Sequence, residues 1–288
     1  MRRFILLLST LAMIALIVNS CIKDENDSLT TTEVPQEVIK KIAIMGFNPD
    51  GIEAVEEGYR IERDIIITHD LLEHAPTDHR VPFAEQYRTT NLVDAGGGRV
   101  ITMYAQEESQ SGGGGKKGGG SGGFSPGMIA GLDEAIDRYN AENLSISFQR
   151  VSSSSNADIV MIRLSKGEER RGVLGSAGFP TASGDPYGEI KMSGILESTY
   201  GLNTDGIATI LAHEIGHCIG LRHTDYFNRS ISCGGGPYNE GDAGVGAIHI
   251  SGTPTGATLA AKSWMLSCTD GGNRPFNNDD KTALDYLY

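Results

Sequence analysis

The segment His213–Asp225, HEIGHCIGLRHTD, combines metal-binding residue types at a spacing that a helix brings together. His213 and His217 are four residues apart and therefore project from the same face of a helix. Two imidazoles in this position can bind one zinc ion, at about 2.0–2.1 Å per nitrogen. Gly220 is expected to end the helix, because glycine accepts the left-handed conformation, and His223 can then return as a third ligand. Three histidines leave the fourth zinc position open for water, as in a catalytic site.

Glu214 follows the first histidine and is too close to it in sequence to reach the same coordination position. We expect it to take a proton from a zinc-bound water. The alternative is an ordinary amphipathic helix that carries two histidines. With only seven histidines among 288 residues, a chance match to all five fixed positions of H-E-x-x-H-x-x-G-x-x-H has odds on the order of one in ten thousand or less.

The extended pattern resembles the metzincin superfamily of zinc endopeptidases. Together with Ser232-Cys233-Gly234 and the segment 246–250, GAIHI, residues 213–225 are similar to the bacterial M57 family, the dual-action HEIGH metallopeptidases. The similarity extends from about Pro35 to the C-terminus. It implies hydrolysis of peptide bonds in proteins or peptides by one catalytic Zn²⁺, with His213, His217 and His223 as ligands and Glu214 as general base and then general acid.

The resemblance also implies an α+β fold of the metzincin type. Its upper subdomain would contain helices and a mixed, twisted sheet of about five strands, and its lower subdomain would be rich in loops, with a Met-turn and a C-terminal helix. The residue patterns agree with this order. They predict strands over 99–105, 144–151, 157–164, 172–179 and 188–192, a helix after Ser125-Pro126, the metal helix from Asn203 or Thr204 to Gly220, and a closing helix over 280–288.

Two further elements of the site follow from the resemblance. Ser263-Trp264-Met265 resembles the Met-turn, in which Met265 forms an apolar floor beneath the histidines; the alternative is an ordinary core methionine. Some metzincins have a tyrosine near the zinc two residues later, but Ser267 stands there, so no such ligand is expected. The edge strand that pairs with bound peptide is best matched by Leu174, Gly175, Ser176, Ala177 and Gly178.

Residues 35–96 are interpreted as a small α+β unit and linker ahead of a catalytic domain at 97–288. A helix is predicted over 35–45 and strands over 52–55 and 59–68. Such a unit suggests a pro-segment that blocks the cleft until it is removed; the alternative is an N-terminal lobe without this role. No cysteine lies between Cys21 and Cys218, so a thiolate block is excluded if Cys21 is lipidated. A carboxylate or histidine block cannot be located from the sequence.

The N-terminus has the features of a lipoprotein signal peptide over residues 1–20. Arg2 and Arg3 precede the apolar run Phe4–Val18, which is shorter than the roughly 20 residues that span a bilayer. Val18-Asn19-Ser20-Cys21 resembles a bacterial lipobox, in which Cys21 is lipidated, and residues 21–34 form a polar tether. We therefore expect an exported lipoprotein of the cell envelope, at the outer membrane, with its orientation open. A transmembrane anchor is the alternative.

Composition limits the partners. A net charge of −13 argues against nucleic acid and against a basic membrane-binding patch, so membrane contact is expected only through the lipid on Cys21. We expect a monomer. If Cys21 is lipidated, three cysteines remain, and Cys233 and Cys268 are expected to pair because the compartment is oxidising, while Cys218 is a small buried side chain. The Gly-rich run 112–123 lacks Walker spacing and is interpreted as a flexible loop.

Two other functions fit parts of the sequence. A non-catalytic surface lipoprotein could use a zincin fold as a binding or adhesion module with structural zinc, but such a site does not need Glu214. A small-molecule metallohydrolase is the third option. The sequence assigns no role to His249 and does not define the cleavage-site preference.

Overall fold

The structure, a computed structural model, describes residues 34–44, 47, 50–73, 86–108, 123–237, 239–240, 246–254 and 256–288. The expected signal peptide, the lipidation site Cys21, the polar tether up to residue 33 and positions 112–122 of the Gly-rich run lie outside these ranges. Within them, no helix is both long enough and apolar enough to cross a membrane.

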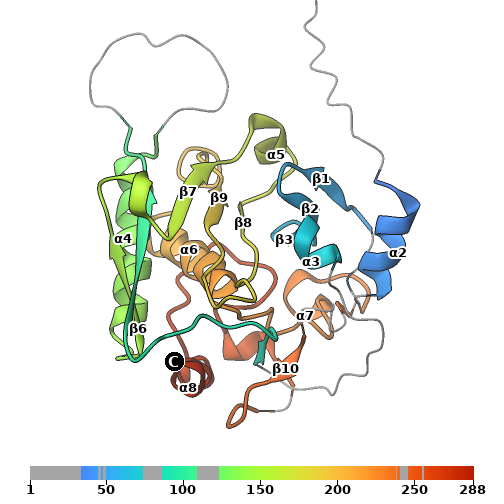
Figure 1. The fold of residues 1–288 in the computed structure, drawn as a ribbon. Helices are drawn as coiled ribbons and strands as arrows, with labels where there is room; N and C mark the ends of the chain where they lie inside the picture. Colours follow the sequence, from blue (N-terminus) through green and yellow to red (C-terminus); the bar gives the residue numbers. More distant parts are fainter. Residues whose placement is uncertain are drawn as a thin grey trace, which may run out of the picture. The chain divides into compact units, whose positions relative to one another are not determined.

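A mixed five-stranded sheet forms the centre of the fold, in the order β6-β5-β7-β9-β8 (Figure 1). Its strands are β5 (Arg99–Ala105), β6 (Ile146–Arg150), β7 (Ile159–Arg163), β8 (Gly175–Ser176) and β9 (Glu189–Met192). The first four in spatial order are parallel, and β8 pairs antiparallel with β9 at the edge. The prediction of an α+β fold with about five strands is confirmed, although the strand expected over 172–179 is only two residues long.

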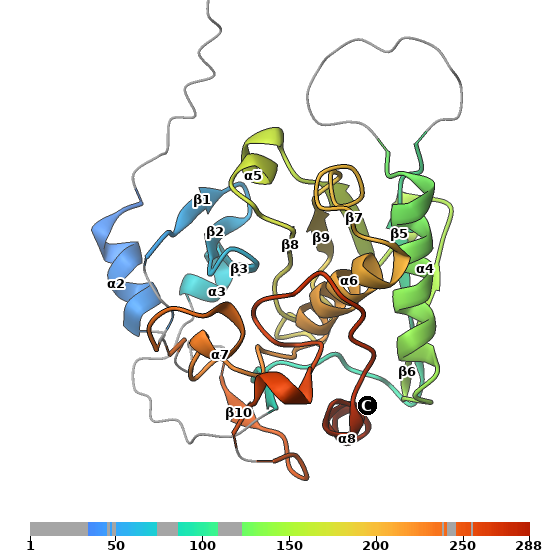
Figure 2. The ribbon, with the colours of Figure 1, turned by 180° about the vertical axis from the view of Figure 1, so that it is seen from behind.

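Two long helices, α4 (Pro126–Asn140) and α6 (Thr204–Cys218), pack against each other and against the sheet (Figure 2). A Cβ on Gly131 of α4 would lie 2.4 Å from Ile207 of α6, so glycine lets the helices approach closely. Every residue from Gly206 to Cys218 is buried, which is the pattern of a core helix. This burial fixes the helix that carries the predicted metal ligands.

The N-terminal part has its own small apolar core. It contains α2 (Gln36–Ile44), β1 (Glu53–Val55), β2 (Gly58–Ile61), β3 (Ile65–Thr68) and α3 (His69–Glu73), and β1-β2-β3 form an antiparallel sheet. The single strand predicted over 59–68 is wrong, because the chain turns between β2 and β3. Glu62 and Arg63 have positive φ angles of 55° and 80°, which end one strand and begin the next.

The remaining elements are mostly short. They are η1 (Ser154–Asn156), α5 (Lys166–Arg170), α7 (Ser230–Cys233), η2 (Leu259–Ala261), α8 (Asn278–Leu287), and the pair β4 (Tyr87–Arg88) and β10 (Ile248–His249). Residues 86–93, which the sequence analysis grouped with the linker, contact the C-terminal half. The Gln86 amide donates to Asp280 at 2.6 Å and to Ser263 at 3.2 Å, and Tyr87 is fully buried.

Candidate metal centre

The three predicted histidines converge on one point. His213 and His217 lie one turn apart on α6, and after the helix Gly220 has φ of +105°, which reverses the chain toward His223. A Cβ at Gly220 would also lie only 2.8 Å from Leu92. The ring centroids are separated by 4.7 Å for His213 and His217, 4.9 Å for His217 and His223, and 5.2 Å for His213 and His223.

Each histidine is oriented by a hydrogen bond at Nδ1. His213 Nδ1 donates to the Trp264 carbonyl at 2.9 Å, and His217 Nδ1 donates to the Leu221 carbonyl at 2.9 Å. Because a carbonyl oxygen only accepts, the proton of both rings is on Nδ1 and the lone pair is on Nε2. His223 Nδ1 lies 2.8 Å from a carboxylate oxygen of Glu240. This is the tautomer that a metal ligand requires. Histidines that bind metals commonly donate their other ring N–H to a carbonyl or carboxylate oxygen in this way.

Burial favours the uncharged form of the two helix histidines. Burial and the neighbouring His223 lower the pKa of His213 to about 4, and burial lowers the pKa of His217 well below its ordinary value. His217 Nε2 is buried and has no hydrogen-bond partner among the described residues. A neutral imidazole with a free lone pair binds divalent metal ions, so these residues fit Zn²⁺.

Glu240 was not found by the sequence analysis. It is fully buried, and although burial by itself raises its pKa, the charges of His223, Arg229 and Arg222 lower it below the ordinary value. In the opposite direction, burial lowers the pKa of His223, but Glu240 and Asp64 raise it well above the usual range. The two carboxylates therefore favour positive charge at His223, whether that charge is a proton or a metal ion. An acidic residue in a loop carries no pattern that could have identified it.

Glu214 lies on α6, and its carboxylate lies against Gly175 of β8. It is 2% exposed, and its Oε2 has no hydrogen-bond partner among the described residues. A Cβ on Gly175 would lie 2.4 Å from Glu214 Oε1, so glycine leaves the room that this carboxylate occupies. Burial, and next the charge of Asp64, raise the pKa of Glu214 well above its ordinary value. A carboxyl group with a raised pKa is suited to both accepting and returning a proton near neutral pH.

Met265 lies directly against the metal helix. It is fully buried, and a Cβ on Gly216 would lie 2.5 Å from its sulfur. Its carbonyl accepts a hydrogen bond from the Thr224 amide at 2.7 Å, next to His223. The Ser267 hydroxyl lies within hydrogen-bond distance of the carboxylates of Asp225, at 2.8 Å, and Glu240, at 3.2 Å, so it helps to hold these two groups in place.

The structure also shows the positions of three cysteines and of His249. Cys233 and Cys268 form a disulfide that links α7 to the loop after Met265. Cys218 is a buried free thiol at the end of α6, and burial raises its pKa well above the ordinary value. His249 lies 3.0 Å from the Thr253 hydroxyl and does not join the cluster.

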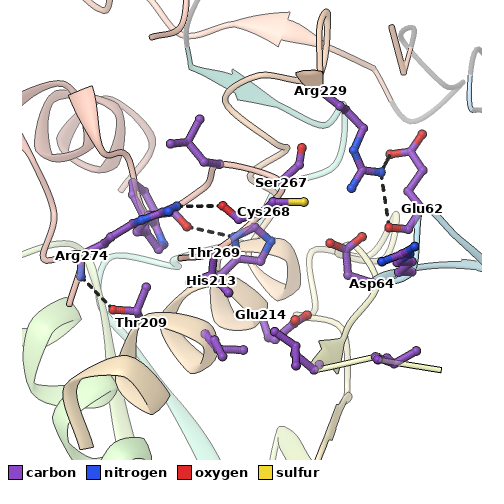
Figure 3. A pocket seen from close by; sticks show the side chains of 18 residues that line it. Glu62, Asp64, Thr209, His213, Glu214, Arg229, Ser267, Cys268, Thr269 and Arg274 are labelled. Atoms are coloured by element: carbon purple, nitrogen blue, oxygen red, sulfur yellow. Dashed lines mark hydrogen bonds and ion pairs between the residues drawn. The ribbon is translucent and has the colours of Figure 1, made fainter. Parts of the chain in front are cut away.

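Asp64 approaches the histidines from the turn between β2 and β3. Its Oδ2 lies 3.2 Å from His223 Nε2, and one ligand atom each from Asp64, His213, His217 and His223 lie within 4.8 Å of one another. Burial alone would raise the pKa of Asp64, but the charge of His223 lowers it to about 2. Figure 3 shows Glu62 and Asp64 facing the site from the side away from Arg274. The sequence analysis missed Asp64 because it interpreted this stretch as a strand.

A pocket of about 160 Å³ opens beside His213 and Glu214 (Figure 3). The walls from α6 and from the C-terminal loop contain both apolar and polar side chains, with Ile210, Trp264 and Leu266 among the apolar ones, and Arg274 lies at one side. Glu62, Arg63 and Asp64 line the pocket from the N-terminal part. The pocket is thus adjacent to His213 and bounded by several segments that are distant in sequence.

The predicted edge strand lies at the edge of the sheet and meets the N-terminal part there. Leu174–Gly178 surround β8, and Ala177 forms a parallel bridge with Ile65. The Ala177 amide donates to the Asp64 carbonyl at 2.8 Å, and the Ile66 amide donates to the Ala177 carbonyl at 2.8 Å. Both backbone groups that Ala177 offers at the edge are therefore used within the chain.

A comparison with known protein families agrees with the chemistry of this site. The family described as "Dual-action HEIGH metallo-peptidase" matches residues 59–288. Two solved structures are similar, "Crystal structure of myroilysin" at 13% identity and a TM-score of 0.36, and "Structure of Myroilysin" at 14% and 0.35. Both alignments cover 69% of this chain, and they cover 86% and 82% of those chains. Scores this low support no argument about function. No curated protein matches the sequence.

Proposed function

This chain belongs to the dual-action HEIGH metallo-peptidase family, and from that premise we propose that it is a zinc-dependent endopeptidase that hydrolyses peptide bonds of proteins. The observation that carries the proposal is the set of three buried histidines, in which each Nδ1 is held by an acceptor. His213, His217 and His223 would hold one catalytic Zn²⁺.

The residues around the histidines have defined roles in this proposal. When bound, the zinc ion activates water and polarises the carbonyl of the scissile bond. Glu214 accepts the proton of the attacking water and delivers it to the leaving amine, for which its raised pKa is suited. Met265 keeps the floor beneath the ligands apolar, and Glu240 holds the ring of His223.

Substrate binding would use the edge of β8 and the neighbouring pocket. An extended peptide can add to an exposed sheet edge through backbone hydrogen bonds, with alternate side chains in pockets. Leu174–Gly178 provide that edge, and the pocket beside His213 would take one substrate side chain. In this proposal the sheet and α6 form the upper subdomain of a metzincin-like fold, and the loops around Met265 form the lower one.

The proposal also covers the cellular location of the enzyme and the form in which it is made. The apolar run and lipobox-like residues up to Cys21 support export as a bacterial lipoprotein, anchored through lipid in the outer membrane. We infer a monomer, made as a zymogen in which the N-terminal unit precedes the catalytic part. Protein or peptide substrates agree with the acidic net charge of −13, which disfavours nucleic acid.

The test measures zinc per chain and cleavage of a peptide library. It uses the full-length protein before and after limited trypsin treatment, with trypsin removed before the assay, and Glu214→Gln as the matched control. We expect one zinc per chain in both proteins and cleavage that Glu214→Gln abolishes. Stoichiometric zinc without cleavage in any state would instead favour the non-catalytic binding module.

A further inference from the structure

We infer that Asp64 is a fourth protein ligand of the metal and that residues 62–66, here called the blocking segment, occupy the site in place of substrate. This inference rests on the proposed function, because it assigns a regulatory role at the same site. It concerns a different part of the chain, however, since none of the residues 62–66 belongs to the family's histidine motif.

The position of Asp64 is that of a ligand. Its Oδ2 is 3.2 Å from His223 Nε2, the nitrogen that would face the metal, and its Oδ1 is buried with no hydrogen-bond partner among the described residues. Three histidines leave one zinc coordination position open, and a carboxylate oxygen is an ordinary zinc ligand. Asp64 therefore competes with water for the position that catalysis requires.

The same segment covers the sheet edge. Asp64 accepts from the Ala177 amide through its carbonyl, and the Ile66 amide donates back to Ala177, both at 2.8 Å. An extended peptide that adds to β8 needs these two backbone groups of Ala177. One short segment thus occupies the open metal position and the peptide-binding edge together, a combination that a lobe with no role at the site would not require.

The backbone of the blocking segment is shaped for this contact. Glu62 and Arg63 have positive φ angles, which are uncommon for residues other than glycine and require support from the surroundings. That support includes Arg229, whose guanidinium lies 3.3 Å from the Glu62 carboxylate and 3.3 Å from its carbonyl. The turn places Asp64 at the histidines rather than in solvent.

Several ion pairs join the N-terminal part to the rest of the chain. Glu53 pairs with Arg171 at 2.8 Å, and Glu57 pairs with Lys191 at 2.7 Å. Arg60, which is 1% exposed, pairs with Glu168. Phe179 is the catalytic part's contribution to the small N-terminal apolar core. The apolar core of the N-terminal part is separate from the main core, so this contact can open without unfolding the main core.

The experiment compares full-length wild type with Asp64→Asn, Asp64→Ala and the control Glu56→Gln, which changes an exposed carboxylate in the turn between β1 and β2. Asp64→Asn keeps the shape of the side chain, so misfolding is not expected to decide the outcome. Three quantities are measured on each protein: the visible spectrum with Co²⁺ in place of zinc, hydrogen exchange at the Ala177 and Ile66 amides, and cleavage of a fluorogenic peptide.

We expect both Asp64 variants to change the Co²⁺ spectrum, to speed exchange at Ala177 and Ile66, and to raise cleavage by about tenfold or more as the open state becomes populated. Glu56→Gln should match wild type in all three. Wild-type spectra and exchange in both Asp64 variants would overturn the inference. A changed spectrum with no cleavage by any variant would support Asp64 as a ligand and contradict the proposed endopeptidase instead.

Discussion

Helix α6 and the β2–β3 turn face the same cluster of histidines from different sides, but different forces hold them there (Figure 3). Helix α6 is buried from Gly206 to Cys218 within the main apolar core, and it packs closely against α4. The turn is supported by ion pairs and by two backbone hydrogen bonds to Ala177. We infer from this difference that α6, here called the permanent side of the site, stays in place, whereas the β2–β3 turn, here called the removable side, can move away from the histidines.

Metal removal should give the largest effect, because it acts on the permanent side. Binding of a ligand only to the folded state at about 1,000 times its dissociation constant adds about 4 kcal/mol of stability. We expect a chelator to abolish peptide cleavage and to lower the unfolding temperature of wild type, but to leave the unfolding temperature of His217→Ala nearly unchanged. Calorimetry of both proteins with and without chelator checks this. An equal decrease in the two proteins would place the metal elsewhere.

The disulfide between Cys233 and Cys268 also belongs to the permanent side. It closes a loop with a sequence separation of 35 residues, for which the chain-entropy estimate gives about 4 kcal/mol. We expect the double variant Cys233→Ala/Cys268→Ala to lose about this free energy of unfolding in urea titrations while zinc content stays at one per chain. If the variant also lost its zinc, the disulfide would be needed for the metal site itself.

Glu240→Gln should have a smaller effect, because it changes a residue that supports a ligand. The amide oxygen can still accept from His223 Nδ1, but the negative charge beside the ring is lost. Outer-contact variants of this kind typically weaken metal affinity by about 10–100-fold. Competition with a chromophoric chelator measures the zinc dissociation constant, and the partly exposed residue Glu134 of α4 provides the control variant Glu134→Gln. Unchanged affinity in Glu240→Gln would mean that the ring is oriented without this carboxylate.

Arg171→Ala should give the smallest effect, since it weakens only the removable side. Arg171 and its partner Glu53 are 43% and 32% exposed, and exposed pairs contribute about 0–1 kcal/mol. We therefore expect hydrogen exchange at Ala177 to quicken by less than about fivefold, with zinc affinity unchanged. A loss of zinc affinity would show that the two sides are not separable.

The sequence predicted the metal helix and its histidines well, because the residues that indicate them are close together in the chain. His213, His217 and Gly220 lie within a few residues of each other, so helix geometry relates them directly, and the family prediction based on them is confirmed by the match over residues 59–288. The sheet prediction succeeded for similar reasons: Ile101 and Met103 are both buried, as the strand pattern requires.

The β2–β3 turn on the removable side could not be predicted, because packing against distant parts of the chain determines its conformation. The isoleucines around Glu62 and Asp64 favour a continuous strand, whereas the surrounding ion pairs and the Ala177 contact stabilise a turn with positive φ angles there. Glu240 follows the same rule, since nothing in its local sequence indicates that it meets His223. Residues that reach a site from a distant segment leave no periodic signal.

The most direct test of the whole account is one peptide-cleavage assay on full-length Asp64→Asn and on the double variant Asp64→Asn/Glu214→Gln, with zinc content measured in both. We predict that Asp64→Asn cleaves the peptide and that the double variant binds one zinc ion yet is slower by about 10²–10⁴-fold, the usual contribution of a general base. Cleavage by the double variant at the rate of Asp64→Asn would contradict the account, because the reaction would then proceed without Glu214.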